Sequence, residues 1–288
     1  MVIARRQFVA GALTLIGGAA RAGSARALPP ERLAAIDWAM MDTALALGQV
    51  PVAACELRQF RARVAQPVLP LGVTDLGLRG SPNLELLQIC RPDLILSSPF
   101  YSSIETQLTR IAPVEIEAFY YQPETPWTRC LAALPALAER LGDRAAGAAR
   151  ADALAEQVAG AGQGLAARPL YLVEIGDARH LRVFGTDSLF GSVAQAMGLE
   201  TAWDRPTQFS FAAPVPLQAL AEREDAAIVI CAPVPALARG ALERSALWQA
   251  LPAVRAGRVY QLSGLNAYGG PLAGADFALR LRAALGAL

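Results

Sequence analysis

Short apolar runs separated by segments with helical spacing make up the first half of the chain. The runs predicted as strands are 33–36, 51–55, 72–76, 94–97 and 114–116. Helical spacing is clearest over 40–47, 83–89 and 104–111. Because strands alternate with helices, the pattern favours a parallel sheet covered on both faces.

A long alanine-rich stretch over 128–165 has helical spacing, a break near Gly142-Asp143 and no strand pattern. The alternation then resumes, with predicted strands at 170–175, 181–184, 226–231 and 259–262, predicted helices at 188–197, 216–222 and from Ala273 onward, and a short element at 247–251. The chain is therefore predicted to form two Rossmann-like α/β lobes, 28–141 and 166–288, bridged by one long helix over 142–165. In such a fold the ligand site lies in a cleft between the lobes, at the carboxyl ends of strands.

The first 27 residues have a different character from the rest. Arg5 and Arg6 precede an apolar run over 8–20, and Ala25-Arg26-Ala27 forms a small-x-small cleavage pattern. This order of charged, apolar and small residues is typical of a secretory signal peptide. Paired arginines followed by an aromatic residue favour the twin-arginine route, with a plain secretory signal as the alternative. We expect a soluble protein in the periplasm.

Composition excludes several classes of protein. The chain has 288 residues, of which 54% are hydrophobic and 18% charged, as in a globular protein. A net charge of +1 without a basic run argues against nucleic-acid binding. The four cysteines, Cys55, Cys90, Cys130 and Cys231, are widely spaced in apolar surroundings, which favours buried free thiols over a disulfide framework.

Motifs for catalysis or metal binding are missing from the sequence. The single histidine, His180, cannot build a zinc site, and it fits a hairpin turn in which Asp177 and its neighbours satisfy one another. Neither a GxSxG elbow nor a phosphate-binding glycine loop occurs. We therefore expect a binding protein without a catalytic or metal site, rather than an enzyme.

The stretch 78–87, LRGSPNLELL, places an arginine just before a predicted helix. Ser81 is a candidate N-cap, Pro82 suits the first helical position, and Glu85 would lie in the first turn. Arg79 is thus predicted to lie on a loop that ordered elements hold on either side.

This stretch also carries a family resemblance. Residues 75–87 and 91–97 resemble segments of the periplasmic iron–siderophore binding proteins of ABC importers, most of all the ferric-hydroxamate type. Further similar segments follow in order at 110–113, 179–180, 183–185, 188–190, 202–203, 247–258 and 268–269. The resemblance implies the two-lobed class III fold and a monomer that captures ferric siderophores for an inner-membrane permease. It implies no cofactor, because the siderophore itself encloses the iron.

The resemblance also implies the residues of the site. Arg79 corresponds to the family's key arginine, whose planar guanidinium offers several donors to hydroxamate oxygens. Tyr101 corresponds to its tyrosine partner, and Trp38 and Tyr268 to aromatic residues that line the pocket. Where the family has further tryptophans, this chain has Ser97, Ser210 and Asn266, and Phe209 and Phe211 are the candidates for replacing their apolar surface. This more polar cleft leaves the ligand open between a hydroxamate and a citrate-type siderophore.

Acidic residues on each lobe dock the family's members on their permease. Glu105 and Glu222 are the candidates here, with a solvated surface as the alternative reading. A corrinoid or haem binding protein of the same fold is the main alternative function, and an exported hydrolase with an unrecognised site is a remote one.

Overall fold

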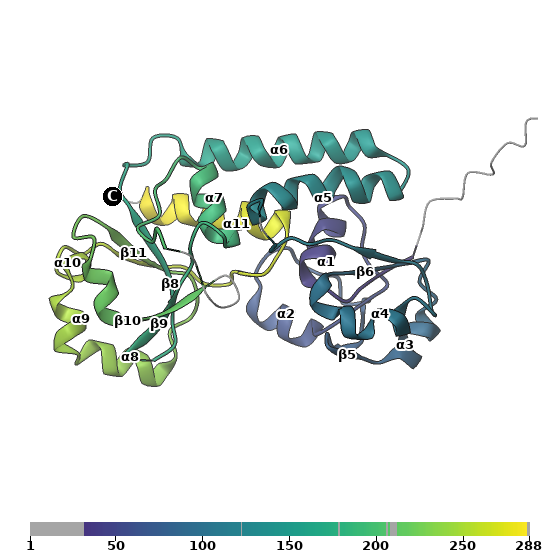
Figure 1. Ribbon diagram of the computed structural model, residues 1–288, viewed down its shortest axis with the longest axis horizontal. Helices are drawn as coiled ribbons and strands as arrows, with labels where there is room; N and C mark the ends of the chain where they lie inside the picture. The colour runs from purple at the N-terminus through teal and green to yellow at the C-terminus, as the bar shows by residue number, and fades with distance from the viewer. Residues whose placement is uncertain (1–31, 122, 178, 206, 208–211, 287–288) are drawn as a thin grey trace, which may run out of the picture.

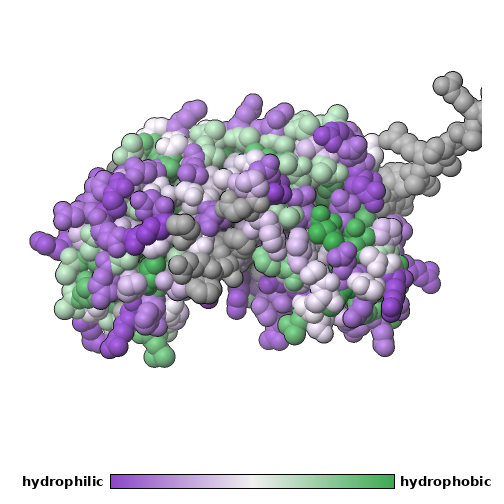
Figure 2. Space-filling model, viewed as in Figure 1, coloured by the Kyte–Doolittle hydropathy of each residue, from purple (hydrophilic) through white to green (hydrophobic). Residues whose placement is uncertain are grey.

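The structure is a computed structural model that describes residues 32–286 except 122, 178, 206 and 208–211. The expected signal peptide therefore lies outside the described residues. Figure 1 shows two α/β halves side by side, with long helices running along one side of both. In the space-filling view the outline is indented between the halves, on the side opposite these helices (Figure 2).

The first sheet is parallel throughout, as predicted. Its strands are β1 (Leu33–Ala35), β2 (Ala53–Ala54), β3 (Thr74–Asp75), β6 (Leu94–Ser97) and β7 (Val114–Ile116), in the order β3-β2-β1-β6-β7. The helices of this half are α1 (Trp38–Ala46), α2 (Leu57–Arg63), α3 (Leu84–Cys90) and α4 (Ser102–Leu108), of which α2 was not predicted. Strands β1 and β6 are buried along their whole length, which explains their continuous apolar runs.

The second sheet is mixed. Its strands are β8 (Leu170–Ile175), β9 (His180–Val183), β10 (Ala213–Pro216), β11 (Ala227–Ile230) and β12 (Val259–Gln261), in the order β10-β9-β8-β11-β12. Strands β8, β11 and β12 are parallel, whereas β9 and β10 are antiparallel to their neighbours. The connection from β8 to β9 is too short for a parallel crossover. Asp177 stabilises it by accepting hydrogen bonds from the N–H groups of Arg179 and His180, as the sequence predicted.

Short helices cover the second sheet and differ in part from the prediction. They are α7 (Leu189–Ala196), the 3₁₀ helix η2 (Leu217–Ala221), α8 (Ala236–Glu243), α9 (Ala246–Ala250) and α10 (Pro252–Arg255). The expected helix at 216–222 is the 3₁₀ turn η2, and α8, α10 and β10 were not predicted. These missed elements contain proline or glycine, or are short, and so carry a weak periodic pattern.

Three long helices pack together in one layer: α5 (Pro126–Arg140), α6 (Arg144–Gly162) and α11 (Pro271–Leu285). Of these, α6 lies within the bridging segment predicted at 142–165. The break expected near residue 142 separates α5 from α6, which run side by side (Figure 1). Gly142 has a φ of 94° there, and Asp143 caps α6. A Cβ on Gly147 would come within 2.4 Å of the Ala138 side chain, so glycine permits the close approach of these helices.

One apolar cluster spans both halves through this helical layer. The Phe277 ring of α11 stacks on Phe190 of α7 with centroids 4.4 Å apart, and Phe190 meets Phe184 edge-on at 5.2 Å. The other face of each sheet packs on a separate apolar cluster, one for the first sheet and one for the second. The core is therefore continuous from the first half to the second.

Polar contacts also cross between the halves. Asp42 of α1 accepts hydrogen bonds from the N–H groups of Gly270, Leu272 and Ala273 at the start of α11. The Tyr120 hydroxyl, after β7, donates to the Gly269 carbonyl at 2.6 Å. These bonds hold the chain that returns from the second sheet against the first half.

All four cysteines are free thiols, as predicted, with Cys55, Cys130 and Cys231 buried and Cys90 partly so. In the described part of the chain, no helix combines the length and apolarity that crossing a membrane requires.

Candidate functional site

Polar residues gather at the carboxyl edge of the first sheet, where the strand order reverses. Strand β1 connects to β2 on one side and pairs with β6 on the other, so its carboxyl end lies at a switch point of the kind where α/β proteins bind ligands. Asp37 follows β1, Glu56 follows β2 and Ser98 follows β6. The topology therefore brings three polar side chains from distant segments to one edge.

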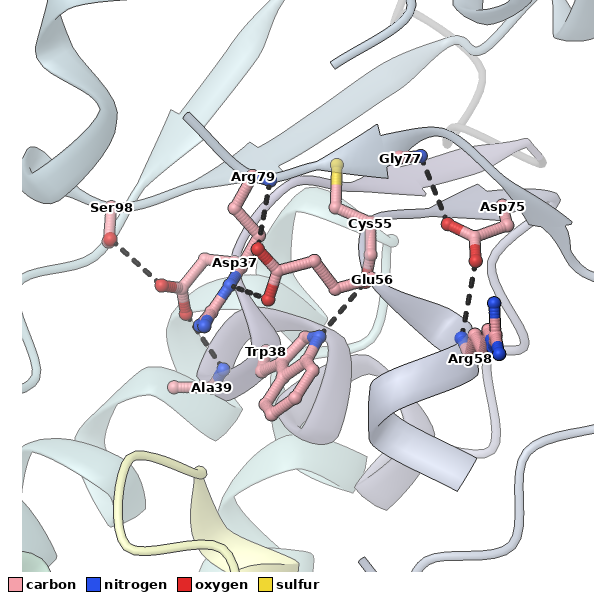
Figure 3. Close-up of polar contacts among 10 residues, drawn as sticks. All are labelled: Asp37, Trp38, Ala39, Cys55, Glu56, Arg58, Asp75, Gly77, Arg79 and Ser98. Atoms are coloured by element: carbon pink, nitrogen blue, oxygen red, sulfur yellow. Dashed lines mark hydrogen bonds and ion pairs between the residues drawn. The ribbon is translucent and has the colours of Figure 1, made fainter. Parts of the chain in front are cut away.

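Arg79 lies in the turn of a small hairpin next to this edge. The turn residues Arg79 and Gly80 join β4 (Gly77–Leu78) to β5 (Ser81–Pro82), which are antiparallel. Asp75 fixes the start of the hairpin, because its carboxylate accepts hydrogen bonds from the N–H groups of Gly77 and Arg58 (Figure 3). Arg79 is thus held by ordered elements on both sides, as the sequence predicted.

The predicted cap of the next helix was wrong. Ser81 and Pro82 are extended and pair with β4, so they are not available to begin the helix. Asn83 is the N-cap instead, and its side chain accepts from the Leu86 N–H at 2.9 Å. Glu85 lies in the first turn of α3, as expected.

The Arg79 guanidinium contacts two neighbouring side chains (Figure 3). Its Nε donates to a Glu56 carboxylate oxygen at 2.9 Å, and its carbon lies 4.4 Å from the centre of the Trp38 ring. The backbone N–H of Arg79 also donates to Glu56, at 3.4 Å. The Arg79 side chain is 26% exposed and that of Glu56 14%, so the pair is only partly screened by water.

Trp38 packs against the Arg79 guanidinium with the face of its ring. Its indole N–H donates to the Cys55 carbonyl at 2.9 Å, and Phe60 meets the ring edge-on at 5.2 Å. Trp38 is only 7% exposed. It therefore lies at the predicted site mainly as the platform on which Arg79 rests, through a cation–π contact.

Asp37 is buried behind this group and was not identified from the sequence. It caps α1 by accepting from the N–H groups of Ala39 and Met40, and the Ser98 hydroxyl donates to it at 2.9 Å. Burial raises the pKa of Asp37, and the hydrogen bonds and nearby Arg79 offset this in part. Its position directly after an apolar strand was the signal available in the sequence, and the same holds for Glu56.

Tyr101 ends the 3₁₀ turn η1 (Pro99–Tyr101), which follows β6 and leads into α4. It is half-buried, and burial raises the pKa of its hydroxyl to about 12. Asp37 raises this pKa further and Arg79 lowers it in part. At neutral pH Tyr101 is therefore a neutral group that can donate a hydrogen bond.

Two candidate site residues of the second half, Asn266 and Tyr268, lie in the same turn. Asn266 is buried, and its side chain accepts from the Tyr268 N–H at 3.2 Å, so it shapes a turn. The Tyr268 ring contacts Tyr120 of the first half with centroids 6.0 Å apart. Phe209, Ser210 and Phe211 lie outside the described residues.

The two acidic candidates for docking lie on opposite halves. Glu105 is in the first turn of α4 and partly exposed. Glu222 follows η2, is exposed and forms an ion pair with Arg205. Neither belongs to the cluster around Arg79.

The arrangement is suited to binding through hydrogen bonds. Arg79 and Tyr101 supply donors at the edge, and the buried Trp38 ring supports Arg79. Across the described ranges, no group of three or more histidine, cysteine, aspartate or glutamate side chains is placed to hold a metal ion.

Comparison with known proteins supports a common origin along almost the whole chain. The family model described as "Periplasmic binding protein" matches residues 33–264. The iron(3+)-hydroxamate-binding protein FhuD of Escherichia coli (strain K12) is 31% identical over 290 residues, which cover 99% of this chain and 97% of that protein.

Solved structures show the same fold. The Fe³⁺–Desferal-bound siderophore binding protein FhuD from Vibrio cholerae has a TM-score of 0.82 and 24% identity, covering 89% of this chain and 98% of that one. A FhuD fold-family protein from Bacillus subtilis, described as a component of a Fep/Fec-like ferrichrome ABC transporter, has a TM-score of 0.68 and 17% identity, covering 91% and 99%. The two lobes joined by helices are thus the class III arrangement predicted from the sequence, and the chain belongs to the periplasmic binding protein family.

Proposed function

We propose that this protein is the substrate-binding component of an ABC importer, and that it captures ferric siderophores of the hydroxamate type. The observation that carries the proposal is the Arg79 guanidinium, held by Glu56 and Trp38 at the carboxyl edge of the first sheet, where Tyr101 ends the turn that follows β6. The 31% identity to a hydroxamate-binding protein over nearly the whole chain supports it.

The chemistry of a hydroxamate fits this edge. Its oxygens share negative charge with the iron and accept hydrogen bonds, and a guanidinium provides donors in a fixed fork. Tyr101 adds a neutral donor. Because Arg79 is already held in place, it loses little conformational freedom when the ligand binds. The iron arrives with its coordination complete, so the protein needs to supply no metal ligand.

The remaining features concern cellular context. Residues 1–27 act as a signal peptide, through the twin-arginine route, that delivers the protein to the periplasm. Lobes at 28–141 and 166–288, joined by the helix at 142–165, form the mature monomer. Glu105 and Glu222, one on each lobe, are the contacts with the permease.

Ligand titration with tryptophan fluorescence tests the function. Mature protein is titrated with ferric hydroxamates, ferric citrate-type siderophores, haem and cobalamin. Trp38, under Arg79, is placed to report a ligand at this edge. Saturable quenching by a ferric hydroxamate is the expected result. A response to haem or cobalamin alone would contradict the ligand assignment and support the alternative binding protein of the same fold.

Variants connect the response to the site. Arg79→Ala is expected to weaken hydroxamate binding at least tenfold, about 1.4 kcal/mol. Arg79→Lys keeps the charge but loses the planar fork, so it should also bind more weakly than the wild type. The matched control is Arg144→Ala, which removes an exposed arginine paired with Glu139 between α5 and α6. Equal affinities for all four proteins would refute the role of Arg79.

A further inference from the structure

Glu56 has an unusual position for a residue that begins a helix. It is the N-cap of α2 with a φ of 54°, in the left-handed region that residues other than glycine rarely adopt. Its N–H donates to the Gly77 carbonyl at 2.8 Å, which ties this conformation to the Arg79 hairpin. The backbone is thus fixed relative to Arg79 before the side chains are considered.

The Glu56 side chain does not cap its own helix. Serine, threonine, aspartate or asparagine at this position ordinarily accepts a hydrogen bond from the first N–H groups of the helix. Here the Arg58 N–H donates to Asp75 instead, and Glu56 makes no such bond. The Glu56 carboxylate turns to Arg79 and accepts from both its Nε and its backbone N–H (Figure 3).

This pairing leaves part of the arginine available. Among the hydrogen bonds of the described residues, Arg79 uses its backbone N–H and Nε and neither terminal nitrogen. The terminal groups can still bind ligand oxygens, while the positive charge is already balanced at 2.9 Å. Arg79 therefore offers donors with little net charge.

A pair of opposite charges also occurs on the second half. Glu174 and Arg182 are directly paired across strands β8 and β9. Arg182 lowers the pKa of Tyr268 and Glu174 raises it. Opposite charges on facing strands largely cancel.

We propose that Glu56 is a selectivity residue, which balances the charge of Arg79 so that the site favours ferric complexes without net negative charge over polyanionic ones. The inference rests on the proposed function and narrows its substrate class. In a tris-hydroxamate complex three singly charged groups neutralise Fe³⁺, whereas a tris-catecholate complex carries three excess negative charges. An unbalanced arginine would attract the second complex strongly, and a balanced one would not.

Two ligands and four proteins test this proposal. The ligands are a neutral ferric tris-hydroxamate and a ferric tris-catecholate, titrated by fluorescence at low and at high salt. Besides the wild type, Glu56→Gln removes the charge with almost no change in shape, and Glu56→Asp keeps it. Glu85→Gln is the control, since it makes the same change in net charge at an exposed position on α3.

The expected result is a change in the ratio of the two affinities. The wild type should prefer the neutral complex. Glu56→Gln should bind the tris-catecholate about tenfold more tightly while its affinity for the hydroxamate changes less than about threefold, and the gain should shrink at high salt. Glu56→Asp and Glu85→Gln should keep the wild-type ratio.

Two kinds of failure are distinguishable. If the wild type binds hydroxamate but Glu56→Gln keeps its ratio, or weakens both ligands equally, Glu56 only positions Arg79 and its role in selectivity is overturned. A wild type that prefers the tris-catecholate overturns it as well. If the wild type binds neither ferric complex, the proposed function itself is overturned. Circular dichroism of each variant shows that the comparison is made between folded proteins.

Discussion

Asp42 provides a sharp test of how this protein joins its halves. The α11 helix has no side-chain cap of its own, and Gly270 occupies the N-cap position. Asp42 replaces that cap from α1, with N–H donors at 2.8, 2.9 and 3.2 Å. Burial raises the pKa of its carboxyl to about 7, although the three N–H groups lower it in part.

The raised pKa makes stability depend on pH in a definite direction. Between about pH 4 and pH 7 the folded protein keeps this proton and the unfolded chain has lost it, so stability falls as pH rises through this range. A shift from 3.8 to about 7 corresponds to roughly 4 kcal/mol in total, of which about 2.5 kcal/mol falls between pH 5 and pH 8. Asp42→Asn cannot ionise and lacks this contribution.

Urea unfolding of the mature wild type and of Asp42→Asn, followed by circular dichroism at several values between pH 5 and pH 8, measures the effect. Other titrating groups cancel in the difference between the two proteins. We expect the difference in the free energy of unfolding, Asp42→Asn minus wild type, to increase by about 2–3 kcal/mol from pH 5 to pH 8. This reasoning would be refuted if the free energies of unfolding of the two proteins changed with pH in parallel. That result would mean that the three N–H groups and the helix N-terminus keep the Asp42 carboxylate ionised from pH 5 to pH 8.

Two further predictions concern packing between elements. Tyr120→Phe keeps the ring but leaves the buried Gly269 carbonyl without its 2.6 Å donor, so urea unfolding should show a loss of about 1–3 kcal/mol; an unchanged midpoint would contradict it. Gly162→Ala should destabilise by more than about 2 kcal/mol, because its Cβ would come within 1.8 Å of the Met197 carbonyl oxygen. Gly160→Ala in the same helix meets nothing within 4 Å and should be neutral or stabilising by up to about 1 kcal/mol, so equal effects of the two substitutions would refute the steric argument.

Local sequence determined most of the secondary structure and the turn that carries one candidate site residue, Arg79. The buried strands β1, β6 and β11 are apolar runs of strand length bounded by polar residues, and burial on both faces produces that pattern directly. The Arg79 turn was recognisable because glycine, proline and asparagine, which favour turns for different reasons, lie around it. The sequence did not show whether Ser81 or Asn83 caps α3, because the answer depends on whether Ser81 pairs with β4.

Tertiary structure decided which groups meet. Glu56 contacts Arg79 from 23 positions away, Ser98 contacts Asp37 from 61, and Ala273 contacts Asp42 from 231. Strand order places these residues together, and hydrophobic periodicity reports only how each segment faces the core, not which segments are neighbours. The sequence by itself therefore determined the two α/β halves and the arginine, whereas the charge balance around that arginine and the cap that joins the halves exist only once the sheet order brings their partners within hydrogen-bonding distance.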